Sequence, residues 1–171
     1  MRTIIVGFLL VAVSTQALAD KYSLVGISSI GVLVEGLGED SKDRTGLTER
    51  ELKTALELRL RQNGIKVYST LEAGRAGSEN ITAHYLEGSP GLYLNVNILP
   101  ARSSCVYVVT LVMSQTVMLL RDPTKETLAT TWETPGELGY GPCNKIGESI
   151  LERVARAVDA FSNDYLAANP K

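Results

Sequence analysis

The chain has 171 residues, of which 17 are lysine or arginine and 19 are aspartate or glutamate, so its formal net charge is −2 at pH 7. Proteins that bind nucleic acid or an anionic membrane surface usually present a strongly basic face, and this composition supplies no such excess. The length suits one domain that can bury a substantial core. We therefore expect neither nucleic acid nor a lipid surface as a partner.

The first 19 residues have the pattern of an export signal. Arg2 gives a positive start, residues 4–13 are an apolar stretch, and Ala17-Leu18-Ala19 resembles a cleavage site. An uncleaved anchor is the alternative, but the stretch is shorter than the ~20 residues that a membrane helix needs. No cysteine lies at the cut, which argues against a bacterial lipid anchor. We expect a signal peptide at 1–19, a single mature domain at 20–171 without a membrane span, and a periplasmic or secreted location.

Residues 28–36 and 65–69 are predicted to be the first two strands. SSIGVLVEG at 28–36 alternates, with Ile30, Val32 and Val34 facing inward, and IKVYS at 65–69 has the composition of a strand. Residues 37–46, which follow the first strand, are predicted to form a polar loop. With a helix between the strands, this order predicts a right-handed parallel crossover.

The helix between these strands has the clearest local signal in the sequence. Thr48 and Glu51 form a capping box, and Leu47 with Leu52 forms a hydrophobic staple. Gly64 suits the left-handed residue that follows a helix end. The helix is therefore expected to start after Thr48 and to end before Gly64.

The second half of the chain predicts an antiparallel meander and a final helix. Strands are expected at 91–99, 105–122 and 126–134, with a bend or bulge near Ser114–Gln115 because the middle strand is unusually long. An apolar stripe predicts a helix over 144–167. Residues 71–90 have no usable period. The predicted fold class is α+β, with one parallel β-α-β crossover, an antiparallel meander, and two helices packed on a mixed sheet.

This order behind a signal peptide resembles the small periplasmic accessory domains of LpoB, PelC and the amino-terminal domain of TolB. The sequence departs from LpoB and PelC in lacking a lipidation cysteine. The ending NDYLAANPK is similar to that of uncharacterised secreted bacterial proteins. The resemblance implies export and partner binding, and it transfers no site residue.

Cys105 and Cys143 are the two cysteines of the chain. If the second hairpin turns at Pro123–Thr124, Cys105 lies opposite residue 142, next to Cys143. We expect a disulfide between them, with two buried free thiols as the alternative.

The sequence contains no complete catalytic, metal or cofactor motif. GISSIG at 26–31 has the wrong spacing for a nucleophile elbow, and GLGEDS at 36–41 precedes its helix by too many residues to cradle a phosphate. His84, the single histidine, lacks a recognisable partner. An acidic cluster is better explained as a solvated loop than as a cation site: Glu35, Glu39, Asp40 and Asp43. We expect no cofactor and no bound metal.

Two function classes remain, an exported accessory protein and a small exported enzyme with an unrecognised site. The first is favoured because an enzyme needs a convergent set of titratable groups, and the sequence does not supply one. The predicted working surface is a face of the meander that is apolar without being the predicted core. The core face carries Leu92, Leu94, Val96, Tyr107, Val109, Leu111, Leu119, Leu128 and Trp132. The opposite face is rich in valine and has amide and hydroxyl groups at its rim, which is typical of an interface. Its predicted partner-binding residues are Tyr93, Asn95, Asn97, Val106, Val108, Thr110 and Met118. The partner would be an envelope protein or a second copy, and the alternative is that a helix or residues 71–90 cover this face.

The export signal predicts that the mature protein begins at Asp20. Intact mass measured on a periplasmic fraction should match residues 20–171, because signal peptidase cuts after small residues at this spacing. A species that retains Met1 in the membrane pellet would contradict the prediction.

Overall fold

The computed structural model of the protein describes residues 21–68 and 90–170, and the predicted signal peptide and His84 lie outside these ranges. Three α-helices and two short 3₁₀ turns form in the described residues: η1 (Lys21–Leu24), α1 (Glu39–Thr45), α2 (Glu49–Gln62), η2 (Cys143–Lys145) and α5 (Ile146–Ala168). The predicted last helix is confirmed.

The strands form one mixed sheet: β1 (Gly31–Val34), β2 (Gly91–Ala101), β3 (Ser104–Leu119), β4 (Asp122–Glu133) and β5 (Glu137–Pro142). β1 pairs in parallel with β2, and β2 pairs antiparallel with β3. The other edge of β3 is shared, because β5 pairs with its first half and β4 with its second half. The predicted α+β class with one parallel pair and an antiparallel meander is therefore confirmed.

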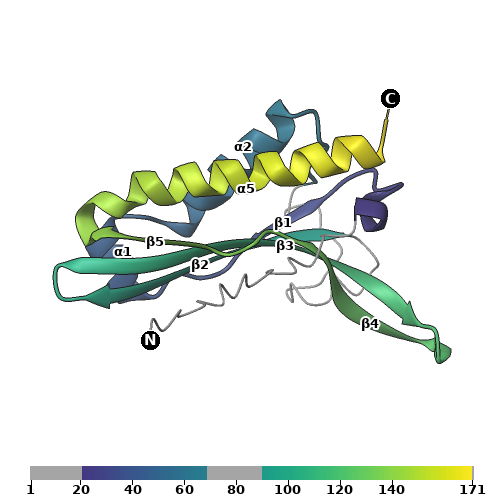
Figure 1. The fold of residues 1–171 in the computed structure, drawn as a ribbon, viewed down its shortest axis with the longest axis horizontal. Coiled ribbons are helices and arrows are strands. Elements are labelled where there is room, and N and C mark those ends of the chain that lie inside the picture. Colours follow the sequence, from purple (N-terminus) through teal and green to yellow (C-terminus); the bar gives the residue numbers. More distant parts are fainter. Residues whose placement is uncertain (1–20, 69–89, 171) are drawn as a thin grey trace, which may run out of the picture.

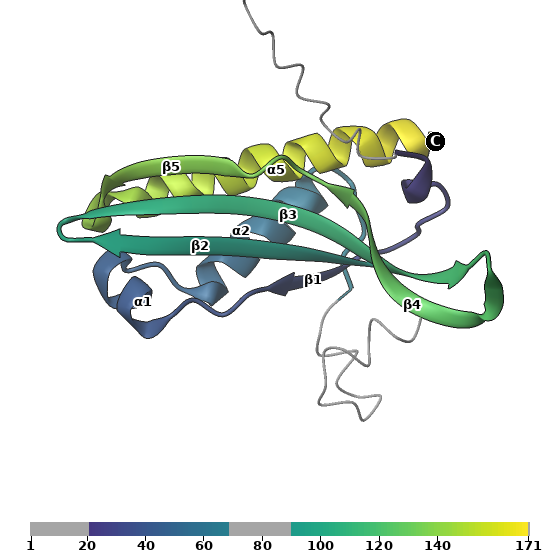
Figure 2. The same cartoon turned by 60° about the horizontal axis from the view of Figure 1, so that its bottom comes forward.

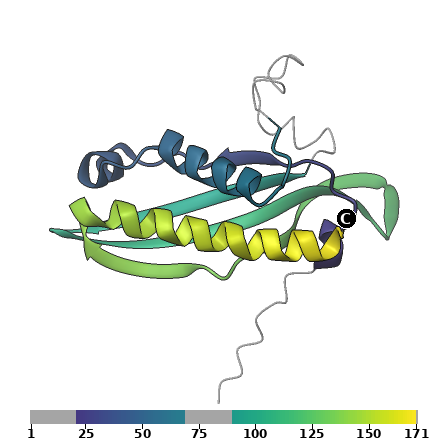
Figure 3. The same cartoon turned by 90° about the horizontal axis from the view of Figure 1, so that it is seen from above.

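Both long helices lie on the same face of the sheet (Figures 1 and 3). The side chains between the helices and the sheet are apolar and almost fully buried, such as Leu94, Leu111 and Phe161. Trp132 of β4 meets Phe161 of α5 edge to face, with ring centroids 4.9 Å apart. Burial of apolar surface between helices and sheet is the main stabilising term of such a two-layer fold.

The capping box and the staple are both present at the start of α2. The Glu51 amide donates to the Thr48 hydroxyl at 3.3 Å, and the Thr48 amide donates to the Glu51 carboxylate at 2.9 Å. Leu47 and Leu52 are buried beside them. Gly64 has φ +78°, the left-handed conformation that the sequence predicted after the helix.

Two local predictions were wrong. Residues 39–45 of the predicted loop form α1, which has acidic residues in its first turn, basic residues in its last, and Gly46 at φ +69° after its end. These charges complement the helix dipole, which stabilises a helix here despite the polar composition of the segment. Of the predicted strand at 65–69, residues 65–68 are described and form no strand, and only Val67 bridges Ile30 in parallel. The strand that pairs in parallel with β1 is therefore β2.

The long strand β3 has the irregularity that its length predicted. The register with β4 shifts between Met113 and Ser114, and this shift confirms the bulge expected near Ser114–Gln115. Because β2 starts opposite Ser114, the rest of β3 continues with β4 as a two-stranded arm beyond the helices (Figure 1).

The predicted registers were wrong by a few residues. Leu94 pairs with Leu111 instead of Val109, a shift of two that keeps both residues on the core face. In the arm, Leu128 pairs with Thr116 instead of Leu119 and is 41 % exposed, so it is not core. The arm has no helix above it, which explains why apolar alternation there does not mean burial.

A disulfide joins Cys105 and Cys143, whose Cα atoms are 4.9 Å apart and whose sequence separation is 38. Cys105 pairs with Gly141 of β5, so the bridge reaches just past the end of that strand into η2. The bond fastens the start of α5 to the central strand and confirms the sequence prediction.

Replacing both Cys105 and Cys143 with alanine should lower the free energy of unfolding by about 3–4 kcal/mol, because the open chain gains entropy when unfolded. Denaturant unfolding of the variant and of the oxidised wild type measures the difference. Mass analysis without reductant should also find one linked peptide pair. Two freely alkylatable thiols in the folded, oxidised protein would contradict the bridge.

Candidate functional site

The sheet face opposite the helices is the main candidate site (Figure 2). Strand pairing arranges its side chains in rows across β2, β3 and β5, because directly paired residues point to the same face. The bulky row is Leu99, Val106 and Tyr140, and the central row is Asn97, Val108 and Leu138. We call the surface made by these rows and by Tyr93, Asn95, Thr110 and Val112 the open face.

The open face exposes large apolar side chains. Tyr140 is 86 % exposed, Leu99 70 %, Leu138 67 % and Val106 36 %. Gly139 between the two β5 side chains lies against the ring of Tyr107 on the core side, where an added Cβ would come within 2.3 Å of it. The glycine therefore lets β5 lie close to the core while its neighbours point outward.

Sequence reasoning missed three residues of this face: Leu99, Leu138 and Tyr140. The segment ELGYGP contains two glycines and a proline, which are depleted in strands. Its alternation of Leu138 and Tyr140 with glycines was the signal that could have revealed it. Leu99 was placed at the end of a strand that in fact continues to Ala101.

Polar groups occupy the part of the open face nearest β1. The Asn97 amide donates to the Asn95 side-chain oxygen. Tyr93 is partly buried and bonds to Glu35, and burial followed by this contact raises the pKa of Tyr93 to about 12. Its phenol therefore stays neutral at physiological pH and can donate or accept a hydrogen bond.

Six of the seven predicted partner-binding residues lie together on this face: Tyr93, Asn95, Asn97, Val106, Val108 and Thr110. Met118 is 66 % exposed but lies on the arm, ten residues from Val108 along β3. At about 3.3 Å per residue this is a separation of roughly 30 Å. The structure does not bring Met118 to the other six.

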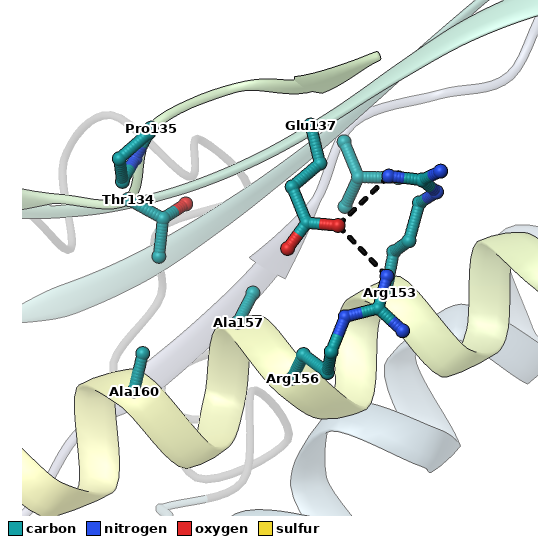
Figure 4. Close-up of a pocket in the computed structure, with 8 residues that line it drawn as sticks. Thr134, Pro135, Glu137, Arg153, Arg156, Ala157 and Ala160 are labelled. Carbon is teal, nitrogen blue, oxygen red and sulfur yellow. Dashed lines mark hydrogen bonds and ion pairs between the residues drawn. The ribbon is translucent and has the colours of Figure 1, made fainter. Parts of the chain in front are cut away.

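A small cavity of about 140 Å³ lies on the other side of the sheet, between α5 and the junction of β4 and β5 (Figure 4). Its walls are mostly apolar, with Val109, Ala157 and Ala160 among them. At its rim, Arg153 and Arg156 both donate to Oε2 of Glu137 at 2.8 Å. The cavity is thus bordered by a three-residue ion cluster.

This cluster connects β5 to α5. Arg153 also donates from Nε to the Tyr107 hydroxyl at 3.2 Å, and its guanidinium lies 5.4 Å from the centroid of that ring. The arginines, Arg156 first, lower the pKa of Glu137 below its usual value. Both arginines are already paired with a carboxylate, so the cluster is best explained as a fastening of the edge strand.

The other polar residues that the sequence singled out do not come together in one site. Asp40 pairs with Arg44, and Glu39 pairs with Lys42 within α1. In residues 21–68 and 90–170, no group of three or more histidine, cysteine, aspartate or glutamate side chains is placed to hold a metal ion. His84 cannot be assessed, because it lies outside the described residues.

No helix of the described chain is long and apolar enough to cross a membrane. The Cys105–Cys143 disulfide is compatible with an extracytoplasmic location, since such bonds persist in oxidising compartments.

Comparison with known proteins gives a weak resemblance in architecture. No family model matches the chain, and no curated protein matches it. A hypothetical protein of Chlamydia trachomatis is 10% identical, with 83% of this chain and 99% of that chain covered and a TM-score of 0.44. A PelC variant of Paraburkholderia phytofirmans, solved as a dodecamer, is 13% identical, with coverage of 84% and 87% and a TM-score of 0.40. A minor lipoprotein of Acinetobacter baumannii is 8% identical, with coverage of 84% and 92% and a TM-score of 0.27. These values assign no function.

Replacing Glu137 with glutamine should make the protein less stable at neutral pH but not in acid. The lowered pKa of Glu137 means that its charge stabilises the fold above the usual carboxyl pKa, and that this stabilisation is lost as pH falls through the lowered value. The gap in melting temperature between wild type and variant should be clear at about pH 7 and closed near pH 2.5. Glu126→Gln, an exposed change on the arm, is the control. A gap that is equal at both pH values would refute the role of the ion cluster.

Proposed function

We propose that the protein is an exported accessory protein of the periplasm or cell surface that acts by binding a protein through its open face. The observation that carries the proposal is the exposure of Leu99, Val106, Leu138 and Tyr140 in adjacent rows of one sheet face. Soluble monomers rarely expose contiguous apolar patches of this kind without a binding role.

The composition of the face matches a protein interface better than an incidental surface. An ordinary solvated sheet face would present lysine and glutamate between its apolar residues. Here the partners of the apolar rows are neutral amides and hydroxyls, such as Asn97 and Thr110. Interfaces combine an uncharged, partly aromatic centre with a polar rim in this way.

Export is supported by two independent features. The amino-terminal sequence has the three parts of a signal peptide. The disulfide joins two segments that are 38 residues apart, and bonds of this kind form in oxidising compartments. Cleavage would leave the domain of residues 20–171 without the apolar start.

A small exported enzyme remains the second candidate, and the cavity beside Glu137 is the feature that favours it. Its carboxylate is flanked by two arginines and lies next to apolar walls. A catalytic site needs a nucleophile or base that is free to react, and this carboxylate is held in ion pairs. Selective stabilisation of the protein by one class of small molecule, lost in Glu137→Gln, would favour this second function.

The proposed function is tested by Val108→Lys and Leu138→Lys, two changes in the central row of the open face. Each places a charge in the contact and should abolish association with the partner while leaving the far-ultraviolet spectrum and melting temperature nearly unchanged. Association is measured as sedimentation of the purified protein and as co-purification from an envelope extract.

Two matched changes control this test. Val109→Lys places the same charge on the core face, where Val109 is 2 % exposed, and should unfold the protein. Thr127→Lys, on the exposed arm, should preserve both fold and association. If Val108→Lys unfolds while Leu138→Lys still binds the partner, Val108 is core and the open face is not the interface.

A further inference from the structure

We infer that the occupant of the open face is a second copy of this chain, packed face to face about a two-fold axis that runs across the strands. The inference rests on the proposed function and adds the identity and the orientation of the partner. It follows from how charge and side-chain size vary along β2, β3 and β5.

Charge on the open face is confined to its two ends. Glu133 pairs with Val112 in the row of Tyr93, and Glu35 bonds to Tyr93 at the same end. Arg102 lies at the other end, in the turn between β2 and β3. The rows between them contain no charged side chain. Nine residues of strand separate the ends, which is about 30 Å.

Glu133 at the acidic end and Arg102 at the basic end form no ion pair within the described chain, so neither of these two charges is neutralised there. A two-fold axis parallel to the strands would place the acidic ends of two copies together. An axis across the strands places the acidic end of each copy over the basic end of the other. Electrostatic complementarity therefore selects the second arrangement.

The mature protein has a net negative charge, so two copies associate more favourably through an uncharged face than through a charged one. Removal of Arg2 with the signal peptide leaves 16 basic residues against 19 acidic ones, a net charge of −3. Two copies repel each other weakly, and contact through the neutral rows limits the like charges that must approach. Opposite charges at both ends then give net attraction.

Side-chain size also differs between the two ends of the open face, on either side of the central row. Leu99, Val106 and Tyr140 form a ridge on one side of the central row. The row on the other side is flat, because Gly136 lies beside Thr110, whose Oγ1 would be 3.5 Å from an added Cβ. An axis through the central row places the ridge of each copy over the flat row of the other.

The area is adequate for such a dimer. Three strands spaced about 4.8 Å apart and ten residues with a rise of about 3.3 Å give a projected face of roughly 500 Å². Specific interfaces bury about 800 Å² of accessible surface per partner, and accessible area exceeds projected area. We therefore expect a dimer that dissociates in the micromolar range, with the two sheets about 10 Å apart and their strands within about 30°.

The test exchanges the end charges in the purified mature protein. Arg102→Glu and Glu133→Arg, each alone, create two like-charge contacts per dimer and should weaken dimerisation about tenfold. An equimolar mixture of the two variants should dimerise like the wild type, because both contacts of the mixed dimer then join opposite charges. Arg121→Glu, at the tip of the arm, is the matched control and should dimerise normally.

Sedimentation equilibrium measures each dissociation constant, and melting temperature checks the fold. Single variants that dimerise as tightly as the wild type, or a mixture that gains nothing over them, would overturn the two-fold arrangement. A wild type that stays monomeric at about 100 µM would overturn self-association, because that concentration lies far above a micromolar dissociation constant. In that case, co-purification of an envelope protein that Val108→Lys abolishes would leave the proposed function standing, and its absence would remove both.

Discussion

Strand β3 is the element on which the rest of the structure depends. It pairs with β2 on one edge, with β5 and then β4 on the other, and carries the cysteine that holds the start of α5. Because successive side chains of a strand point to opposite faces, its register decides at once which residues lie under the helices and which lie on the open face. A shift of one residue would exchange Val108 and Val109.

The helices fix this register from one side only. Phe161, Val158 and Val154 of α5 are almost fully buried against the sheet, and Arg59 of α2 binds Asp159 of α5 through two bonds of 2.7 and 2.6 Å. The two helices are thereby joined to each other as well as to the sheet. No helix of the described chain lies on the opposite face, where Leu99, Leu138 and Tyr140 are exposed.

Edge strands that lack a covering element usually invite unwanted pairing. In this protein β5 is short, and Glu137 connects it to Arg153 and Arg156 of α5. Its backbone is thereby held against β3 while Leu138 and Tyr140 remain exposed on the face. The ion cluster beside the cavity and the open face are thus parts of one arrangement, in which the edge is fixed and the face is left exposed.

Local signals in the sequence determined the elements whose stabilising contacts are close in sequence. The capping box of Thr48 and Glu51, the left-handed Gly64 and the apolar stripe of the last helix all describe contacts within a few residues, so they could be recognised without the fold. The alternation of Leu92, Leu94 and Val96 likewise assigned six of the seven proposed binding residues to one face. The predicted disulfide needed only an approximate register: Cys105 pairs with Gly141, one residue from the predicted position 142, and the bond to Cys143 still forms.

Only the tertiary structure decided the features that depend on distant partners. ELGYGP becomes a strand because β3 offers an unpaired edge and Tyr107 fills the space beside Gly139, and neither fact is written in the segment itself. Leu128 is exposed because the arm extends beyond the helices, although its pattern is that of a core strand, and Met118 lies on the same arm. The sequence by itself thus determined which side chains share a face within each regular stretch of strand, since alternation is a local property of the backbone, but the register shift at Met113/Ser114 moved Leu128 off the predicted core face. Which face was covered, and how far along each strand, depended on where two helices distant in sequence came to lie.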